Sequence, residues 1–228
     1  MEKNELPDLV MDGVNTAAGG RYHQVNINGV SKINGALSAH TCNCDGVMKL
    51  NGDLAAEEME MNGTLNLKGN LQVGEMKLNG VVNAEGSLRG ERCVMDGMLK
   101  LKGNCELEEL TGEGVFTVGG LLSAGRIEFG LQGHSEAGEI GVESLVIRKK
   151  GNAAWGKLLG GMIPKLKIEL QAKLIEGDTL DLEYTTADVV RGGTVIIGQG
   201  CSIGRVEYSG ELTVHPGAHV EKEEKTGE

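Results

Sequence analysis

The sequence predicts an all-β chain: a single-stranded, triangular parallel β-helix with about 17 residues in each turn. The first observation behind this prediction is a pair of interleaved glycine series, in each of which glycine recurs at every seventeenth position. The second is a strict alternation of apolar and polar residues between those glycines. The third is composition, because 37 glycines but only six aromatic residues occur in 228, which favours a core of aliphatic side chains.

The two glycine series mark the corners of the predicted turns. Glycine tolerates tight bends and φ > 0, so a recurring glycine between short apolar segments indicates a recurring corner. The first series comprises Gly29, Gly46, Gly63, Gly80, Gly97 and Gly114, and the second comprises Gly35, Gly52, Gly69, Gly86, Gly103 and Gly120.

The alternation defines three short strands in each turn. Six repeat units run from Val25 to Arg126, and positions 1, 3, 7, 9, 13 and 15 of these units hold 33 apolar residues out of 36. The other eleven positions hold only 9 apolar residues out of 66. Alternation with period two is typical of strands that point every second side chain inward. One such turn cannot bury its inner face alone, so the turns must stack.

The phase of the repeat divides the chain into five segments. It is lost after about residue 143 and returns at Val189. We therefore expect a flexible N-terminal tail, regular β-helix turns, irregular turns with a basic amphipathic excursion, C-terminal β-helix turns and a charged tail. Their ranges are 1–20, 21–143, 144–188, 189–222 and 223–228.

The charge and the hydropathy exclude several classes of protein. A net charge of −11 argues against a general nucleic-acid-binding protein, which needs a basic face for phosphates. The acidic N-terminus does not have the pattern of a signal peptide, and no apolar stretch is long enough to span a bilayer. We therefore expect a cytoplasmic protein.

The cysteines are predicted to be buried thiols rather than ligands. Cys42-x-Cys44 could suggest a metal site, but both residues fall at inward positions, and no second Cys or His pair is spaced to complete a zinc site. The remaining three also fall at inward positions, and an odd number of cysteines does not fit a disulfide framework. The five are Cys42, Cys44, Cys93, Cys105 and Cys201. We expect no metal and no cofactor.

No catalytic constellation emerges from the pattern. The repeat places no nucleophile beside a histidine, the carboxylates occupy outward or corner positions, and the glycines do not open a helix after a strand as in nucleotide-binding loops. The histidines are His23, His40, His134, His215 and His219. We therefore predict no catalytic or cofactor-binding residue, no small-molecule substrate and a non-enzymatic role.

One segment interrupts the acidic background. Residues 148–167 contain six Lys or Arg and no acidic residue, and their apolar residues follow the spacing of one helix face. Such a segment either rests on an anionic membrane or a partner, or caps an open face of the β-helix. The predicted contact residues are Trp155, Leu158, Leu159, Met162, Lys149 and Lys157.

The ends of a β-helix present strand edges whose backbone groups need partners. Unless they are capped, such edges recruit another chain, so the pattern predicts end-to-end self-association. The predicted contact residues are Val25, Ile27, Val206, Tyr208, Leu212 and Val214. The apolar residues of the N-terminal tail (Leu6, Leu9, Val10 and Met11) belong either to a disordered leader or to a weak membrane or partner anchor.

The repeat resembles that of the bactofilins, polymer-forming bacterial cytoskeletal proteins. The units KINGAL, KLNGDL and NLKGNL carry the resemblance, and VVRGGTVIIGQGCSIGRVEYSGELTV is similar to a Gram-positive branch of that family. The resemblance covers roughly residues 22–222. It implies a right-handed β-helix that forms filaments without nucleotide, as a homopolymer or with a paralogue. It also implies an N-terminal tail that holds the filament at the membrane, and a scaffolding role in cell shape, wall synthesis or motility.

The alternative function is that of an acyltransferase with a left-handed β-helix and an acyl-CoA donor. The segment IGQGCSIG, from Ile197 to Gly204, is similar to the hexapeptide repeats of that fold. This similarity is isolated, however, and the dominant period is that of the glycine series.

Overall fold

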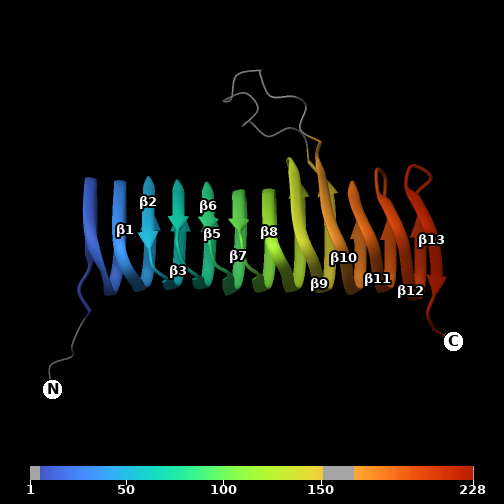
Figure 1. Cartoon of the computed structure of the whole chain (residues 1–228), viewed down its shortest axis with the longest axis horizontal. Coiled ribbons are helices and arrows are strands. Elements are labelled where there is room, and N and C mark those ends of the chain that lie inside the picture. The colour runs from blue at the N-terminus through green and yellow to red at the C-terminus, as the bar shows by residue number, and fades with distance from the viewer. Residues whose placement is uncertain (1–5, 151–166, 228) are drawn as a thin grey trace. The chain divides into compact units, whose positions relative to one another are not determined.

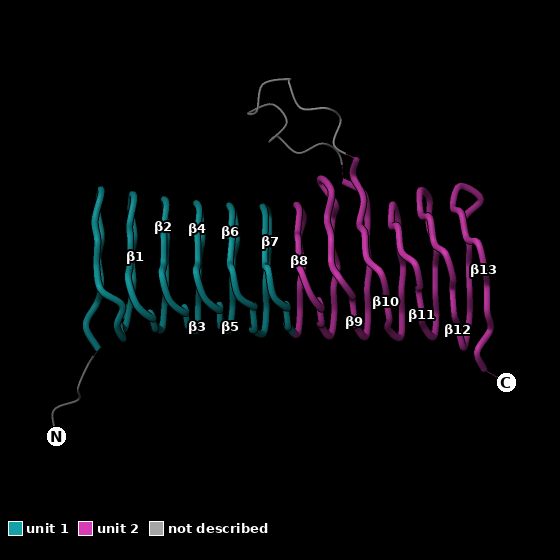
Figure 2. Tube along the Cα trace, in the orientation of Figure 1, with its two compact units in different colours: residues 1–107 teal, residues 108–228 magenta. Residues whose placement is uncertain are grey.

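The computed structural model describes residues 6–150 and 167–227, and every regular element in these ranges is a β-strand. The chain divides into two compact units, residues 1–107 and residues 108–228, which Figure 2 shows in different colours. Both units consist of stacked turns of parallel strands, so the predicted parallel β-helix is confirmed. No helix of the described residues is long and apolar enough to cross a membrane.

Unit 1 is built from turns of constant length. Its strands pair in parallel with partners seventeen positions away, as Val30 with Val47, Val47 with Thr64 and Thr64 with Val81. The strands are β1 (Leu9–Cys44), β2 (Val47–Asn51), β3 (Leu54–Met61), β4 (Thr64–Leu67), β5 (Leu71–Leu78), β6 (Val81–Ala84) and β7 (Leu88–Leu101) (Figure 1). The period predicted from the glycines is therefore the spacing of the turns, which confirms the predicted turn length.

The three predicted corners differ in backbone structure. From Gly46 to Gly86 the two glycine corners interrupt the strands, as between β2 and β3, although β1 runs through Gly29 and Gly35 and β7 runs through Gly97; the third corner is a bend within a strand. β3 runs through that bend, and its pairing with β1 skips His40 and Glu57 there. Only the glycine corners therefore separate the elements of a regular turn.

The first glycine series is explained by close packing between turns. A Cβ atom added to Gly63 would lie 2.0 Å from the carbonyl oxygen of Gly46, and one added to Gly80 would lie 2.1 Å from that of Gly63. Left-handed backbone, the reason expected from the sequence, holds for Gly29 but not for Gly46, Gly63 or Gly80. Most of this series is glycine because the neighbouring backbone leaves no room for a side chain.

The core of unit 1 consists of aliphatic columns that follow the predicted inward positions. Leu50, Leu67 and Leu101 belong to one column and are at most 1% exposed. Ser31 is also buried, at 1% exposed, and its hydroxyl has no hydrogen-bond partner. Ser31 is a polar exception in its column, because its neighbour in the next turn, Met48, is apolar.

The predicted tail of residues 1–20 is wrong for residues 9–20, which belong to β1 and form an additional turn. The backbone N–H of His23 donates to the carbonyl of Pro7 at 2.9 Å, and the side-chain amide of Asn28 donates to Asp12 at 3.0 Å. The Asn28–Asp12 contact joins residues sixteen positions apart, one fewer than the seventeen of equivalent side-chain contacts in the regular turns, such as Asn51 with Asn34. The sequence pattern missed this turn because its spacing differs and its inward positions carry few large apolar residues.

Unit 2 contains turns of unequal length. β8 (Cys105–Leu131) begins in the last residues of unit 1. It is followed by β9 (His134–Lys149), β10 (Glu169–Leu182), β11 (Thr185–Ile197), β12 (Ser202–Val214) and β13 (His219–Lys225). All pairings are parallel, but Ile127 pairs with Leu145, eighteen positions later, whereas Leu180 pairs with Val195, fifteen positions later.

The predicted irregular turns of residues 144–188 correspond to the end of β9, to β10 and to the start of β11, whose pairings do not follow the spacing of seventeen. β9 pairs directly with β10, so that Leu145 lies beside Leu180 although two turns' length of chain separates them. The chain between Lys149 and Glu169 thus connects two strands that pair directly with each other. The predicted basic amphipathic excursion lies mostly in residues 151–166, outside the described residues.

The predicted charged tail 223–228 is also partly wrong. Residues 223–225 belong to β13, and Glu223 pairs with Val206. Glu223 lies in register with the buried Val206 and therefore faces the same side of the sheet, yet the side chains of Glu223 and Lys225 are exposed. Charge alone therefore did not mark the end of the stack, because this last described strand accepts a charged residue even in register with a core residue.

Candidate functional site

The first candidate association surface is the first described turn of unit 1. Residues 9–22 form this turn, which lies at the N-terminal end of β1 (Figure 1). Its outward side chains include Val10, which is 60% exposed, and Val14, which is 85% exposed; Leu6, just before the turn, is 44% exposed. Because Met11 is buried beneath them, this turn presents an apolar surface on a folded backbone.

The predicted N-terminal contact residues lie one turn deeper. Val25 and Ile27 are 0% and 1% exposed, because the turn of residues 9–22 stacks against theirs. Their side chains cannot form a contact surface, so this part of the predicted site is wrong. The prediction placed the end of the β-helix at the first turn with the regular spacing.

The second candidate association surface is the outer edge of β12 in unit 2. Residues 211–214 pair with β11 on one side, whereas β13 pairs only with residues 202–208. Within residues 167–227, no strand pairs with the other side of residues 211–214. Leu212 and Val214, both predicted contact residues, are half-buried at this edge.

The other two predicted C-terminal contact residues are covered by β13. Val206 is 0% exposed and pairs with Glu223, so its side chain is part of the core and its predicted contact role is wrong. Tyr208 is half-buried, and the amino group of Lys225 lies 6.0 Å from the centre of its ring. The structure therefore leaves Leu212 and Val214 as the predicted residues nearest to a free strand edge.

A ladder of ion pairs runs along the flank beside this edge. The guanidinium of Arg191 lies 2.6 Å from Glu207 and 3.1 Å from Glu176, and Arg205 lies 2.7 Å from Glu207. The hydrogen bond from Arg191 lowers the pKa of Glu207, although desolvation opposes the shift. The same hydrogen bond raises the pKa of Arg191. Both groups therefore stay charged at neutral pH and join three successive turns.

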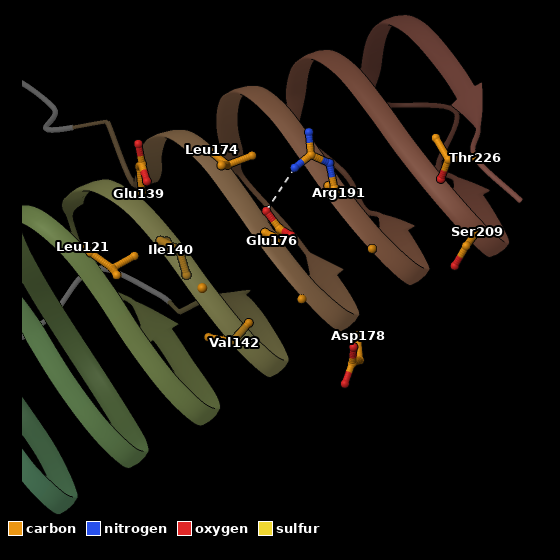
Figure 3. A pocket seen from close by; sticks show the side chains of 13 residues that line it. Leu121, Glu139, Ile140, Val142, Leu174, Glu176, Asp178, Arg191, Ser209 and Thr226 are labelled. Atoms are coloured by element: carbon orange, nitrogen blue, oxygen red, sulfur yellow. Dashed lines mark hydrogen bonds and ion pairs between the residues drawn. The ribbon is translucent and has the colours of Figure 1, made fainter.

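The ladder borders a groove of about 560 Å³ on unit 2 (Figure 3). Gly141, Gly177 and Gly192 line it together with carboxylate and apolar side chains. Ser209 and Thr226 supply hydroxyl groups, and Glu139, Glu176 and Asp178 supply the carboxylates. The Glu176–Arg191 ion pair, drawn as a dashed line in Figure 3, occupies the one guanidinium of the lining. The groove therefore combines hydroxyl, carboxylate and apolar side chains on one surface of unit 2.

Of the predicted membrane or partner contact residues, only Lys149 lies in the described part of the chain. Trp155, Leu158, Leu159, Met162 and Lys157 lie outside the described residues. The amino group of Lys149 lies 4.0 Å from the centre of the Tyr184 ring, and its backbone N–H donates to Glu183 at 3.2 Å. Tyr184 adopts a left-handed backbone with φ of 47°, which costs conformational energy in a non-glycine residue.

A second interaction lies at the end of β9. Arg148, the residue before Lys149, forms an ion pair with Asp181 in the neighbouring strand, and this hydrogen bond raises the pKa of the arginine. The end of β9 is therefore fixed by the ion pair of Arg148 and the cation–π contact of Lys149.

The five cysteines lie in the core, as the sequence predicted. Burial raises the pKa of Cys42 and of Cys93 to about 12, and it also raises the pKa of Cys44, Cys105 and Cys201. A thiol with such a pKa stays protonated at neutral pH, whereas metal binding and nucleophilic attack require the thiolate. In the described ranges, no three His, Cys, Asp or Glu side chains are arranged to hold a metal ion.

The sequence interpretation missed one surface of unit 1. The outward residues of β2, β4, β6 and the paired parts of β1 and β7 carry lysines beside a row of apolar side chains. We call this surface the lysine–valine face; its residues are Val30, Lys32, Asn34, Val47, Lys49, Asn51, Thr64, Asn66, Lys68, Val81, Asn83, Glu85, Met98, Lys100 and Lys102. The sequence carries this pattern as apolar residues and lysines that recur at positions 6, 8 and 10 of the repeat. The net charge of a whole segment does not reveal it, because acidic residues at other positions cancel the lysines.

Comparisons with known proteins identify two relatives in Bacillus subtilis (strain 168). The chain is similar to the uncharacterized protein YhbE, with 41% identity over 110 residues, or 47% of this chain and 44% of YhbE. It is also similar to the uncharacterized protein YhbF, with 39% identity over 108 residues, or 47% of this chain and 41% of YhbF. The chain thus matches less than half the length of either relative.

No protein-family model matches the chain, and no solved structure matches it. The similarity to YhbE and YhbF therefore shows relatedness over about half of the chain and assigns no activity.

Proposed function

We propose that the protein is a self-assembling scaffold whose β-helical turns associate end to end into filaments without nucleotide, close to the membrane. The observation that carries the proposal is the outer edge of residues 211–214, which pairs on one side only within the described ranges. A strand edge of this kind offers backbone donors and acceptors to another chain. The resemblance to bactofilins, noted above from the repeat, points to the same function.

The first described turn of unit 1 provides a partner for this edge. It carries a strand backbone and the exposed side chains of Val10 and Val14. Leu212 and Val214 are the apolar residues at the edge of β12 in unit 2. A contact between two copies would thus combine backbone hydrogen bonds with apolar burial, as neighbouring turns do within one chain. Since such a contact consists of strand edges, it requires no bound nucleotide.

The experiment compares substitutions at the two edges with matched substitutions on the flanks. Val14→Asp and Leu212→Asp place a charge in the proposed contact. Val94→Asp and Leu121→Asp place the same charge at side chains that are 45% and 40% exposed but lie in β7 and β8, away from the edges. Negative-stain electron microscopy and sedimentation, both without nucleotide, measure filament length.

The proposal predicts full-length filaments for the unchanged protein and for the two flank variants. Val14→Asp and Leu212→Asp are expected to give short filaments or single chains with unchanged circular dichroism. Filaments of normal length from both edge variants would refute the proposed contact. Monodisperse unchanged protein at every salt and protein concentration would refute self-assembly itself.

The cellular role follows from the same proposal. A filament of β-helical subunits offers many identical flanks, which suits a scaffold that positions machinery for cell shape, wall synthesis or motility. The proposal includes assembly as a homopolymer or with a paralogue. Filament length measured with the purified chain alone distinguishes a homopolymer from a copolymer, because a copolymer would not elongate without the paralogue.

A further inference from the structure

We infer that the lysine–valine face of unit 1 binds the surface of a bilayer that contains anionic lipids. The inference goes beyond the proposed function, because a single chain would bind in this way whether or not chains assemble. It also uses described residues other than those of the basic segment 148–167.

The face is a continuous sheet of five paired strand segments. Val30, Val47, Thr64, Val81 and Met98 pair in sequence across β1, β2, β4, β6 and β7. Figure 2 shows β2, β4 and β6 side by side in unit 1. Because successive strands lie about 4.8 Å apart, equivalent side chains form straight rows on this face.

One of these rows faces outward and is apolar except for Thr64 at its centre. Val30 is 44% exposed and Met98 is 40% exposed, while Val47 and Val81 between them are half-buried. Apolar residues at these positions do not belong to the core, whose columns are formed by the alternate residues. The row therefore lies against solvent in a single chain.

The lysines form the neighbouring rows and concentrate positive charge. Between residues 30 and 102 the sequence has eight Lys or Arg and nine Asp or Glu. Five of the eight cations lie on this face but only one of the nine carboxylates, Glu85, which lies 3.6 Å from Lys102. The face is thus strongly basic in a chain with net charge −11.

The other cations of this range are occupied differently. Arg89 pairs with Glu106 at 2.7 Å, and Arg92 pairs with Glu75 at 2.8 Å. By contrast, Lys32, Lys49, Lys68 and Lys100 are exposed, and within the described ranges none of them forms an ion pair with an acidic side chain. These four amino groups are available to an external anion.

The size and the composition of the face favour a membrane over a protein partner. Five strands of five residues cover roughly 24 Å by 16 Å, or about 400 Å². A stable protein–protein contact buries about 800 Å² on each partner and is anchored by aromatic or arginine side chains. The face contains no Trp, Tyr, Phe or Arg. Lysines beside a short apolar row suit an interface of lipid headgroups, where each lysine contributes independently.

The net negative charge of the chain does not prevent this binding. At physiological ionic strength, screening reduces electrostatic interactions over about 8 Å. Of the nine carboxylates between residues 30 and 102, only Glu85 lies on the face that would contact the bilayer. The charge of the nearest face therefore dominates the interaction.

The experiment measures flotation of the purified full chain with vesicles of phosphatidylcholine, alone or mixed with an equal part of phosphatidylglycerol. The face variant is Lys49→Gln with Lys100→Gln. Its matched control is Lys77→Gln with Lys173→Gln, which makes the same change in net charge at exposed lysines elsewhere. Sedimentation of each variant without lipid records its state of assembly.

The unchanged protein and the control variant are expected to float with the anionic vesicles and not with the phosphatidylcholine vesicles. Removing two lysines from the face is expected to weaken partitioning on the order of 10- to 30-fold, because each lysine near an anionic surface contributes about fivefold. The inference is overturned if the face and control variants bind equally, or if binding does not require phosphatidylglycerol.

A change in assembly of the face variant without lipid would also overturn the inference, because it would identify a second copy of the chain as the occupant of the face. Loss of self-assembly in the unchanged protein, by contrast, would refute the proposed scaffold while leaving vesicle binding testable on single chains.

Discussion

Substitution of one corner glycine tests how closely the turns of unit 1 are stacked. Gly63→Ala adds a single methyl group, whose carbon would lie 2.0 Å from the carbonyl oxygen of Gly46. A carbon and an oxygen that are not bonded need about 3.3 Å. The turn must therefore separate locally from its neighbour by about 1.3 Å.

The displacement also affects a hydrogen bond. The carbonyl of Gly46 accepts the backbone N–H of Thr64 at 2.7 Å, and a separation larger by about 1.3 Å exceeds the range of a hydrogen bond. The lost bond costs about 1 kcal/mol, and the strain of an overpacked site costs about 1–3 kcal/mol. We expect Gly63→Ala to lower the free energy of unfolding by about 2–4 kcal/mol.

The assay is chemical denaturation followed by circular dichroism, with the midpoint compared at constant slope. Gly141→Ala is the control, because the nearest heavy atom to its added methyl carbon, in Leu121, is 3.9 Å away and its φ lies outside the left-handed range. We expect the control to change stability by less than about 0.5 kcal/mol. Equal midpoints for the two variants would refute the explanation of the glycine series by contact between turns.

Four further predictions follow from burial and charge. Leu67→Asp places an unpaired charge in a core column, so the variant is expected to be unfolded by circular dichroism, whereas Leu67→Met stays folded. Ser31→Val removes a buried hydroxyl that has no partner, and should raise the free energy of unfolding by about 1 kcal/mol in urea titrations. Cys42 and Cys93 should react with a thiol reagent at pH 8 only after denaturation, because burial raises their pKa to about 12; rapid labelling of folded protein would contradict this. The pKa of Glu207 is lowered, so its stabilising effect is present above the ordinary carboxyl pKa and is lost as pH falls through the lowered value; the difference in urea midpoint between the unchanged protein and Glu207→Gln should therefore shrink on acidification.

The regular turns could be predicted because every repeat unit has apolar residues and glycines at the same positions, and these positions specify the strands and corners of the turn. In the column of Leu50, Leu67 and Leu101, apolar residues recur at every seventeenth position, and the pairing register follows the same number. Local alternation and the long-range period agree, so the strands, the core and the burial of all cysteines follow from the pattern alone.

The ends and the irregular part could not be predicted in the same way. The first described turn contacts the next with a shorter spacing, and the spacings within unit 2 differ from one pair of strands to another, so no single period finds them. The contact residues Val25 and Val206 were misplaced for this reason, since an end is defined by its neighbours rather than by its own sequence. The lysine–valine face does not stand out in the sequence because its residues are not consecutive. They recur at the same positions of successive repeat units.

The unequal turns of unit 2 have a consequence for folding. In unit 1, a strand that slips by one whole repeat meets side chains almost equivalent to the correct ones, because the spacing between paired strands is constant. In unit 2, such a slip would separate Arg148 from Asp181 and Arg191 from Glu207. The irregular half of the chain therefore has only one low-energy alignment. We expect it to act as the reference from which alignment errors in the repetitive half are corrected during folding.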